Sequence, residues 1–222
     1  MPEEERVRSV FNSIYNKYDL IDSIISFGMD SAWRRTMISM AGSRQYKSIL
    51  DCGAGTGKLT MQLRKKFPDA RMVALDVSDQ MISLIPDPGI ERVVGSAVEL
   101  PFDSSSFDLV TSAFLTRNVP SIEAYLKEAY RVLRKDGALI NLDIHTPVIH
   151  GYREIFSLYF FHVVPIIGDL LTGSNSYSYL SNSVRNFVGP DELIDKARQA
   201  GFSLERKVLK AMQSISIIRF NK

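Results

Sequence analysis

The sequence contains one cysteine, Cys52, among 222 residues. A single cysteine excludes an internal disulfide and any metal site built from several cysteines, and we predict no metal centre. The 27 basic and 25 acidic residues give a net charge of +2, and neither sign gathers into a block, so nucleic acid is not an expected partner. The charged stretch MPEEERVRSV lacks the apolar core of a secretory signal, which indicates a cytoplasmic protein.

Long apolar runs are also scarce. The richest one, IFSLYFFHVVPIIG at 155–168, has 14 residues and contains His162 and Pro165. A membrane-spanning helix needs about 20 apolar residues, so we expect a cap helix instead. Two compatible interpretations stay open: the helix is buried on the core, or its inner face lines an apolar substrate pocket.

The periodicity of apolar residues changes along the chain. Up to residue 42 they recur at steps of three and four, which is typical of helices. Five later segments, rich in β-branched residues, are predicted to be buried strands: 47–53, 70–77, 90–96, 107–114 and 137–144. Helices are predicted between and after these strands, and two further strand candidates end the chain: helices 58–67, 79–84, 121–133 and 190–200, then strands 202–209 and 213–220.

This alternation predicts an α/β protein with a doubly wound, mostly parallel sheet. The length suits a single domain with a full core. We expect four parts in it: an amino-terminal helical cap (1–45), a ligand-binding core (46–145), a helical insertion that caps the substrate (146–189), and a carboxyl-terminal helix with strands (190–222).

A glycine-rich loop follows the first predicted strand in ILDCGAGTGKLT, residues 49–60. A nucleoside-triphosphate loop would need glycine at Cys52 and serine or threonine at Leu59, and neither is present. A dinucleotide fingerprint would need its third glycine at Lys58 or Thr60, and both lack it. The loop is therefore predicted to bind something other than these two ligands, and a nicotinamide oxidoreductase is disfavoured.

What remains is Asp51 followed by Gly53, Gly55 and Gly57. Glycines let the backbone approach a ligand closely, and the helix that begins near Gly57 attracts a carboxylate as readily as a phosphate. S-adenosylmethionine (SAM) has such a carboxylate, and Asp51 can offset its ammonium and sulfonium charges. The alternative for Asp51 is a solvated strand end.

Two more strand ends are candidate ligand contacts. Asp76, with Val77 beside it, ends the second strand, where a carboxylate can accept both ribose hydroxyls. The alternative for Asp76 is a cap on the following helix. Ser96 and Ala97 end the third strand and are expected to meet the adenine edge, whereas the alternative for Ser96 is an ordinary turn residue.

These motifs resemble class I methyltransferases, and more narrowly the C-methyltransferases of ubiquinone and menaquinone biosynthesis. The matching stretches are VFNSIYNKYDLIDSIISFGMDSAWRR, LDCGAGTGKLT, ELPFDSSSFDLVT, RNV, AYRVLRKDGAL, FHVVPIIGDLL and SYSYLSNSVRNF. The resemblance implies a seven-stranded, Rossmann-like sheet and SAM-dependent methylation of a ring carbon of a polyprenyl quinol, of the demethylmenaquinol to menaquinol type.

The resemblance also carries cofactor positions onto Thr56, Asp76, the Ser96–Ala97 pair and Ala113. Four positions depart from the family pattern. Lys58 stands where an acidic residue is common, Ser96 where asparagine is, and Ala113 and Leu115 where serine and glycine are. Lost side-chain hydrogen bonds are worth about 0.5–1.5 kcal/mol each, so weaker cofactor binding is expected.

Methylation of a ring carbon requires an electron-rich ring, so the expected acceptor is the reduced quinol. Arg117 and Asn118 follow the fourth strand, at the sheet edge where ligands gather. Arginine stays protonated, so we assign Arg117 to the developing oxyanion or to an ordered water that Asn118 orients. The alternative is an arginine paired with a surface carboxylate and an asparagine that caps a helix.

Tyr18 and Tyr177 are predicted to contact the quinol, and His162 to relay a proton, with a satisfied core histidine as the alternative. Two other functions stay open: methylation of another apolar small molecule, and a catalytically weak cofactor-binding scaffold in a quinone-making complex. The sequence leaves open the prenyl length, a homo-oligomer and peripheral membrane attachment.

Overall fold

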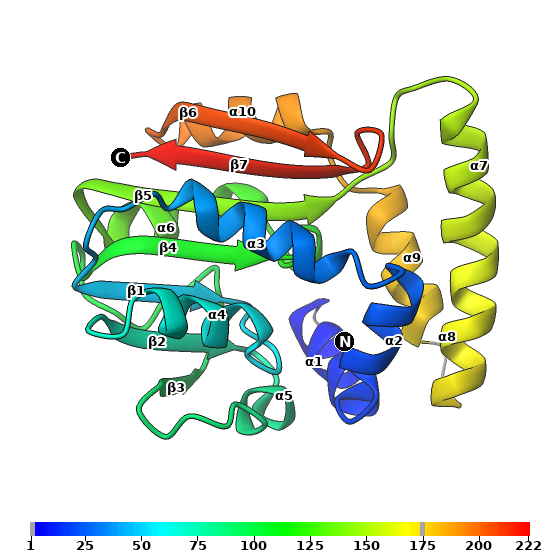
Figure 1. The fold of residues 1–222 in the computed structure, drawn as a ribbon, viewed down its shortest axis with the longest axis horizontal. Coiled ribbons are helices and arrows are strands. Elements are labelled where there is room, and N and C mark those ends of the chain that lie inside the picture. Colours follow the sequence, from blue (N-terminus) through cyan, green and yellow to red (C-terminus); the bar gives the residue numbers. More distant parts are fainter. Residues whose placement is uncertain (1–2, 174–175) are drawn as a thin grey trace.

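The computed structural model describes residues 3–173 and 176–222. Its centre is a seven-stranded sheet in the order β3-β2-β1-β4-β5-β7-β6 (Figure 1). The strands are β1 (Ser48–Cys52), β2 (Arg71–Asp76), β3 (Glu91–Val94), β4 (Phe107–Ala113), β5 (Leu133–Ile144), β6 (Ser203–Lys210) and β7 (Ile215–Asn221). Strands β1 to β5 pair in parallel, and β7 is antiparallel to both neighbours, which confirms the predicted class.

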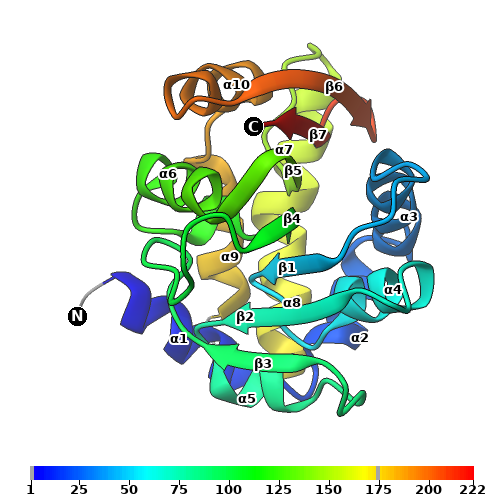
Figure 2. The ribbon, with the colours of Figure 1, turned by 90° about the vertical axis from the view of Figure 1, so that its left-hand side faces the viewer.

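Helices cover both faces of the sheet (Figure 2). One face packs against α3 (Asp30–Met40) and α4 (Lys58–Lys66), and the other against α6 (Ile122–Val132) and α10 (Pro190–Gln199). Consecutive strand residues point to opposite faces, so Ile49 joins the first cluster and Leu50 the second. This burial on both sides explains why the central strands are continuous apolar runs.

A third group of helices lies beyond the carboxyl ends of the parallel strands (Figure 1). It comprises α1 (Glu3–Ile14), α2 (Tyr18–Ile25), α5 (Asp79–Ser83), α7 (Tyr152–Leu158), the π-helical turn η2 (Tyr159–Val163), α8 (Val164–Thr172) and α9 (Ser176–Arg185). The amino-terminal helices and the insertion share an apolar cluster of Ile14, Ile21, Val164, Tyr177 and Leu180. Segments far apart in the sequence thus form one cap.

Two expectations are wrong, one about the burial of a strand and one about the length of a helix. Strand β3 is not buried, because it is an edge strand whose residues are mostly exposed. The apolar segment is also not limited to 14 residues, since α7, η2 and α8 run on as one helix of 21 residues, Tyr152–Thr172. Pro165 does not break this helix because it follows the π-helical turn η2, and the carbonyl of Phe160, five residues earlier, accepts a hydrogen bond from Ser181 Oγ at 2.9 Å.

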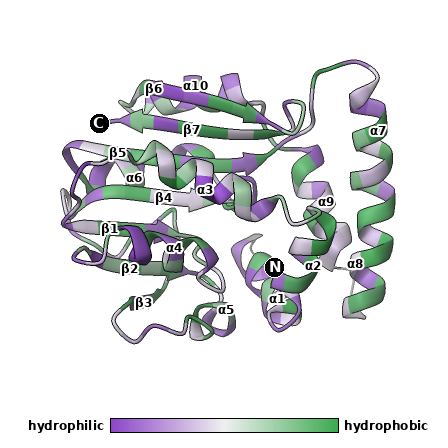
Figure 3. Ribbon diagram, viewed as in Figure 1, coloured by the Kyte–Doolittle hydropathy of each residue, from purple (hydrophilic) through white to green (hydrophobic). Residues whose placement is uncertain are grey.

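By length and composition this helix could cross a membrane. Only 17% of its most apolar window is buried in the protein. Figure 3 shows that much of this helix is apolar, with hydrophilic positions between the apolar ones. Its inner face packs on the cap through Phe156, Val164 and Gly168. Its outer face is exposed, so the interpretation as a helix buried on the core holds for the inner face alone.

The glycine loop after β1 has left-handed backbone at all three glycines, with φ of 66° at Gly53, 55° at Gly55 and 85° at Gly57. A Cβ atom at Gly57 would lie 2.8 Å from Cγ1 of Ile85. Gly57 therefore serves both the turn and the close packing of Ile85, just after α5.

We expect Gly57→Ala to destabilise the protein more than Gly42→Ala, which is the matched control. Gly42 has φ of 73° but no atom within 4 Å of the added Cβ, so its cost is backbone strain of about 1–2 kcal/mol. Gly57→Ala adds a clash worth about 1–3 kcal/mol more. Urea unfolding of both variants measures the difference, and equal losses would contradict the clash.

Candidate functional site

Two cavities adjoin at the carboxyl ends of the parallel strands. The loop cavity lies around the glycine loop, and the cap cavity lies between α2, η2 and α9. Their empty space, counted with the open solvent at their mouths, is about 860 Å³ and about 900 Å³. Tyr18 and Phe114 line both cavities. The predicted site residues on the loop cavity are Tyr18, Asp51, Gly53, Gly55, Thr56, Asp76, Val77, Ala97, Ala113 and Asn118.

Asp51 ends β1 under the glycine loop, and its side chain is buried, which excludes a solvated strand end. Thr60 Oγ1 donates to Asp51 Oδ2 at 2.6 Å, and Thr111 Oγ1 donates to Oδ1 at 2.9 Å. Burial raises the pKa of Asp51 to about 6, although both hydroxyls act to lower it. Asp51 therefore offers an oriented carboxylate that is ionised at neutral pH.

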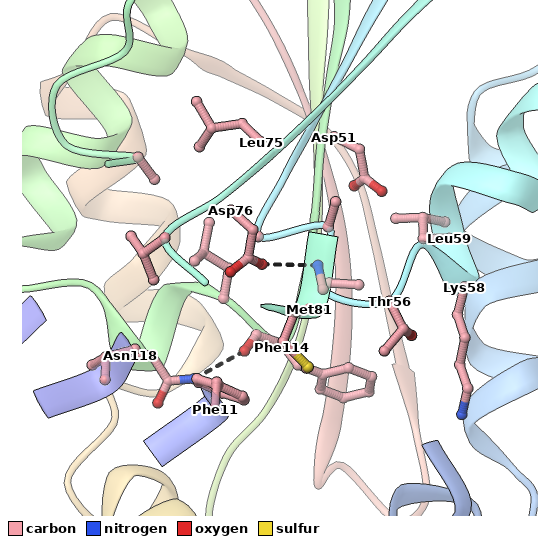
Figure 4. A pocket seen from close by; sticks show the side chains of 18 of the residues that line it. Phe11, Asp51, Thr56, Lys58, Leu59, Leu75, Asp76, Met81, Phe114 and Asn118 are labelled. Atoms are coloured by element: carbon pink, nitrogen blue, oxygen red, sulfur yellow. Dashed lines mark hydrogen bonds between the residues drawn. The ribbon is translucent and has the colours of Figure 1, made fainter. Parts of the chain in front are cut away.

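Asp76 lies across the same cavity (Figure 4). The Gly55 amide donates to its Oδ2 at 2.8 Å, and the Ser78 amide donates to its Oδ1 at 2.9 Å. The Val77 amide also acts on this carboxylate, and a carboxylate can accept more hydrogen bonds than these three. Asp76 does not cap helix α5, because Ser78 does so through its hydroxyl and the Met81 amide.

The side chains of Thr56 and Lys58 connect the glycine loop to the cap. Thr56 Oγ1 donates to Asp19 Oδ1 at 2.8 Å, and Lys58 Nζ donates to the Asp19 carbonyl at 3.0 Å. Lys58 Nζ also lies 3.6 Å from Asp30 Oδ2. Thr56 lines the cavity, but its hydroxyl is bonded to Asp19.

Helix α1 contacts the loop cavity through Glu4, Val7 and Phe11. The Ser96 hydroxyl donates to the Glu4 carboxylate, so its side chain is used within the protein and is not part of the cavity lining. Ala97, its predicted partner at the adenine edge, does line the cavity.

Phe114 separates the two cavities and has a φ of 63°, which is rare for a bulky residue. This conformation aims its carbonyl at Arg117 Nη1, 2.7 Å away, and at Asn118 Nδ2, 3.2 Å away. Asn118 does not cap α6, because Ser121 does. The buried Asn118 Oδ1 has no hydrogen-bond partner.

Arg117 lines the cap cavity and is paired with a buried carboxylate, not a surface one. Its Nη1 lies 2.7 Å from Asp143 Oδ1, and the Asp143 side chain has no exposed surface. Its Nε is buried without a partner. This pairing fixes the guanidinium at the boundary of the two cavities.

Tyr177 also lines the cap cavity, and its buried hydroxyl has no partner. Its position depends on Gly168, because a Cβ there would lie 2.1 Å from Cγ of Tyr177. Asp169 Oδ1 accepts the Tyr177 amide at 2.8 Å and so fixes the start of α9.

The prediction for His162 is wrong. Its side chain is exposed and lines neither cavity, because η2 turns this position to the outside of the cap. The sequence analysis also missed Phe114 and Asp22, which both face the cap cavity. Asp22 had a signal: it lies four residues after Tyr18, hence on the same helical face.

The chain matches the model of the ubiE/COQ5 methyltransferase family over residues 1–210. It is 35% identical over 209 residues to the demethylmenaquinone methyltransferase of Oceanobacillus iheyensis, and the match covers 90% of this chain and 88% of that protein. It is 36% identical, with the same coverage, to the demethylmenaquinone methyltransferase of Anoxybacillus flavithermus.

A solved structure from Thermotoga maritima, described as a SAM-dependent methyltransferase and possible histamine N-methyltransferase, shares the fold. The TM-score is 0.69 at 20% identity, and the match covers 97% of this chain and 99% of that one. The family match and the relatives identify the chain as a SAM-dependent methyltransferase that belongs to the ubiE/COQ5 methyltransferase family.

Proposed function

We propose that the protein methylates a ring carbon of a polyprenyl quinol, of the demethylmenaquinol to menaquinol type, with SAM bound in the loop cavity and the quinol in the cap cavity. The observation that carries this proposal is that the two cavities meet at Tyr18 and Phe114. One has the carboxylates that a cationic nucleoside requires, and the other is lined mainly by aromatic and aliphatic side chains. The names of the two relatives support the quinol as acceptor.

The residues of the loop cavity fit SAM. Asp76 can accept further hydrogen bonds from the ribose hydroxyls, and Asp51 supplies the negative charge for the ammonium or sulfonium group. The glycine loop approaches without side chains. Bound there, SAM supplies an electrophilic methyl group.

In the cap cavity, this chain holds and orients the quinol. Phe156, Phe160, Val164 and Leu180 line the cavity and give the ring an apolar environment. Arg117 Nε is a buried donor without a partner, so it can bind the charge that develops on the quinol oxygen.

We further propose that this cytoplasmic protein docks on the membrane surface to collect its lipid-soluble acceptor. Large apolar side chains of α2, the turn after it and the long helix are exposed: Leu20, Phe27, Ile155, Leu158, Ile166 and Leu170. The Phe27 ring stacks on Tyr159 with centroids 5.6 Å apart, and both residues line the cap cavity. The exposed apolar surface therefore continues into the cavity.

Asp51→Asn tests the loop cavity. The raised pKa means that the contribution of Asp51 to unfolding stability is full below about pH 4 and is lost as pH rises through about 6. The variant should keep or raise the melting temperature at pH 8, because it removes a buried charge. SAM affinity should fall about tenfold or more, since a charged contact is lost.

Calorimetric titration with SAM and a thermal melt between pH 4 and 8 measure both effects. In the unmodified protein, SAM binding should weaken below pH 6 as Asp51 is protonated. Unchanged affinity in Asp51→Asn would remove Asp51 from the cofactor site.

The acceptor is tested by mass spectrometry. Purified protein with SAM and chemically reduced demethylmenaquinone should yield a product heavier by one methylene, and the oxidised quinone should yield none. If SAM binds but no product forms, the acceptor is another apolar molecule or the protein is a scaffold.

Vesicle sedimentation tests the membrane proposal. The double variant Ile166→Asp, Leu170→Asp should bind phosphatidylglycerol vesicles about tenfold more weakly or worse, because each buried leucine or isoleucine contributes about 1.5–3 kcal/mol. Leu84→Asp, an exposed apolar residue at the end of α5, is the matched control and should bind normally. Equal binding by all three proteins would exclude this surface.

A further inference from the structure

Among the residues that the structure describes, three polar side chains of the cap cavity have a buried atom without a hydrogen-bond partner. These atoms are Asp22 Oδ2, Tyr177 Oη and Arg117 Nε. An unpaired buried polar group costs about 1–3 kcal/mol, so three around one apolar cavity call for an explanation. The polar groups of a bound ligand would satisfy all three.

Of these three side chains, only Asp22 can act as a base and accept a proton from a ligand. Arg117 is a permanent cation and has donors alone. Burial raises the pKa of Tyr177, and the nearby carboxylates raise it further, so this phenol stays neutral. Asp22 is the one carboxylate in the described lining of the cap cavity.

The surroundings of Asp22 favour a carboxylate that can change its protonation state. Arg34 Nη2 is the nearest cation, 3.7 Å from Asp22 Oδ2, and Arg34 is also paired with Asp30 at 2.5 Å. Burial raises the pKa of Asp22 despite the cations around it. The groups that act on Asp22 are Tyr18 from its own helix, Asp30 and Arg34 from α3, Lys58 from α4, Arg117 from the 3₁₀ turn η1 (Thr116–Asn118) and Tyr177 from α9.

We propose that Asp22 is the catalytic base, which takes the hydroxyl proton of the quinol as the ring carbon is methylated. This assignment rests on the proposed function, and it adds a residue that the sequence analysis did not consider. Tyr18, one helical turn away, lines both cavities, so Asp22 lies beside the point where the cavities meet.

In this step the O–H bond of one quinol hydroxyl breaks, its electron pair stays on oxygen, and the proton moves to Asp22 Oδ2. The electron-rich ring carbon forms a bond to the methyl carbon of SAM, while the methyl–sulfur bond breaks with its pair on sulfur. The proton of that ring carbon leaves to water, and the oxygen recovers the proton from Asp22. One proton is released for each methyl group transferred.

Asp22→Asn keeps the shape of the side chain and removes the base. Its kcat should fall about 100-fold or more, the usual contribution of a general base. SAM affinity should change far less than kcat, because Asp22 does not line the loop cavity. In the unmodified protein kcat/KM should fall as acid protonates Asp22, and the variant should lack this acidic limb.

Asp22→Ala with added formate separates a base from a structural residue. The smaller side chain leaves room for a carboxylate, so formate should restore turnover at least tenfold. It should not rescue Asp22→Asn, where the amide fills the space. A readout independent of turnover is the infrared carboxyl band of the protein alone, which should lose in Asp22→Asn a group that titrates above the ordinary aspartate pKa of 3.8.

The outcomes distinguish the two proposals. If the unmodified protein binds SAM but methylates no quinol, the proposed function falls and the role of Asp22 falls with it. If the unmodified protein methylates the quinol and Asp22→Asn keeps its kcat within threefold, only the role of Asp22 is overturned. Failure of formate to rescue Asp22→Ala, in a variant that still binds SAM, also overturns it.

Discussion

The position of helix α2 depends on a chain of charges that crosses from the cap to the sheet. Lys58 at the start of α4 contacts Asp19 and Asp30, and Arg34 contacts Asp30 and Asp22. Asp30 and Arg34 are almost fully buried, so loss of either partner would leave an uncompensated charge inside the protein. Both cavities share a wall made by α2, and these ion pairs hold that wall against the glycine loop.

The same chain of charges explains one departure from the family pattern. From the sequence, Lys58 is predicted to weaken cofactor binding, because an acidic residue is common at this position in the family. In the structure, Lys58 points at two carboxylates of the cap, and its ammonium group is bound by them. Leu115 also has a packing role, since its side chain lies against Gly53 of the loop. Lys58 and Leu115, two of the residues that differ from the family pattern, thus make contacts that hold the glycine loop in place.

The fold was predictable because its signals are local. Strand β1, the glycine loop and helix α4 lie within one stretch of sequence, and the apolar period changes at each boundary. The course of the long helix was not predictable from periodicity, because Pro165 usually marks an end and here occupies a first-turn position after a π-helical turn. His162 lies in this π-helical turn, and its side chain is exposed there.

The site was predictable at strand ends and not in the cap. Asp51 and Asp76 end parallel strands, and this alone brings them to one edge of the sheet. Phe114 gave no signal, because its positive φ is imposed by contacts made only in the folded chain. Asp22 lies among apolar residues in helix α2. The sequence predicts this helix as part of the cap but does not indicate which of its faces is buried.

Burial raises the pKa of both Asp51 and Asp22, but the two carboxylates have different roles. The pKa of Asp51 rises to about 6, so this carboxylate is still ionised at neutral pH and can balance a bound cation. Asp22 is also destabilised as an anion, and it lines an apolar cavity with its Oδ2 buried 3.7 Å from Arg34 Nη2. An anion that is poorly solvated is a stronger base, and a proton from the quinol would relieve that cost. Tyr18 and Phe114 border both cavities, so the two carboxylates act on opposite sides of one boundary: one retains its charge and the other gives it up.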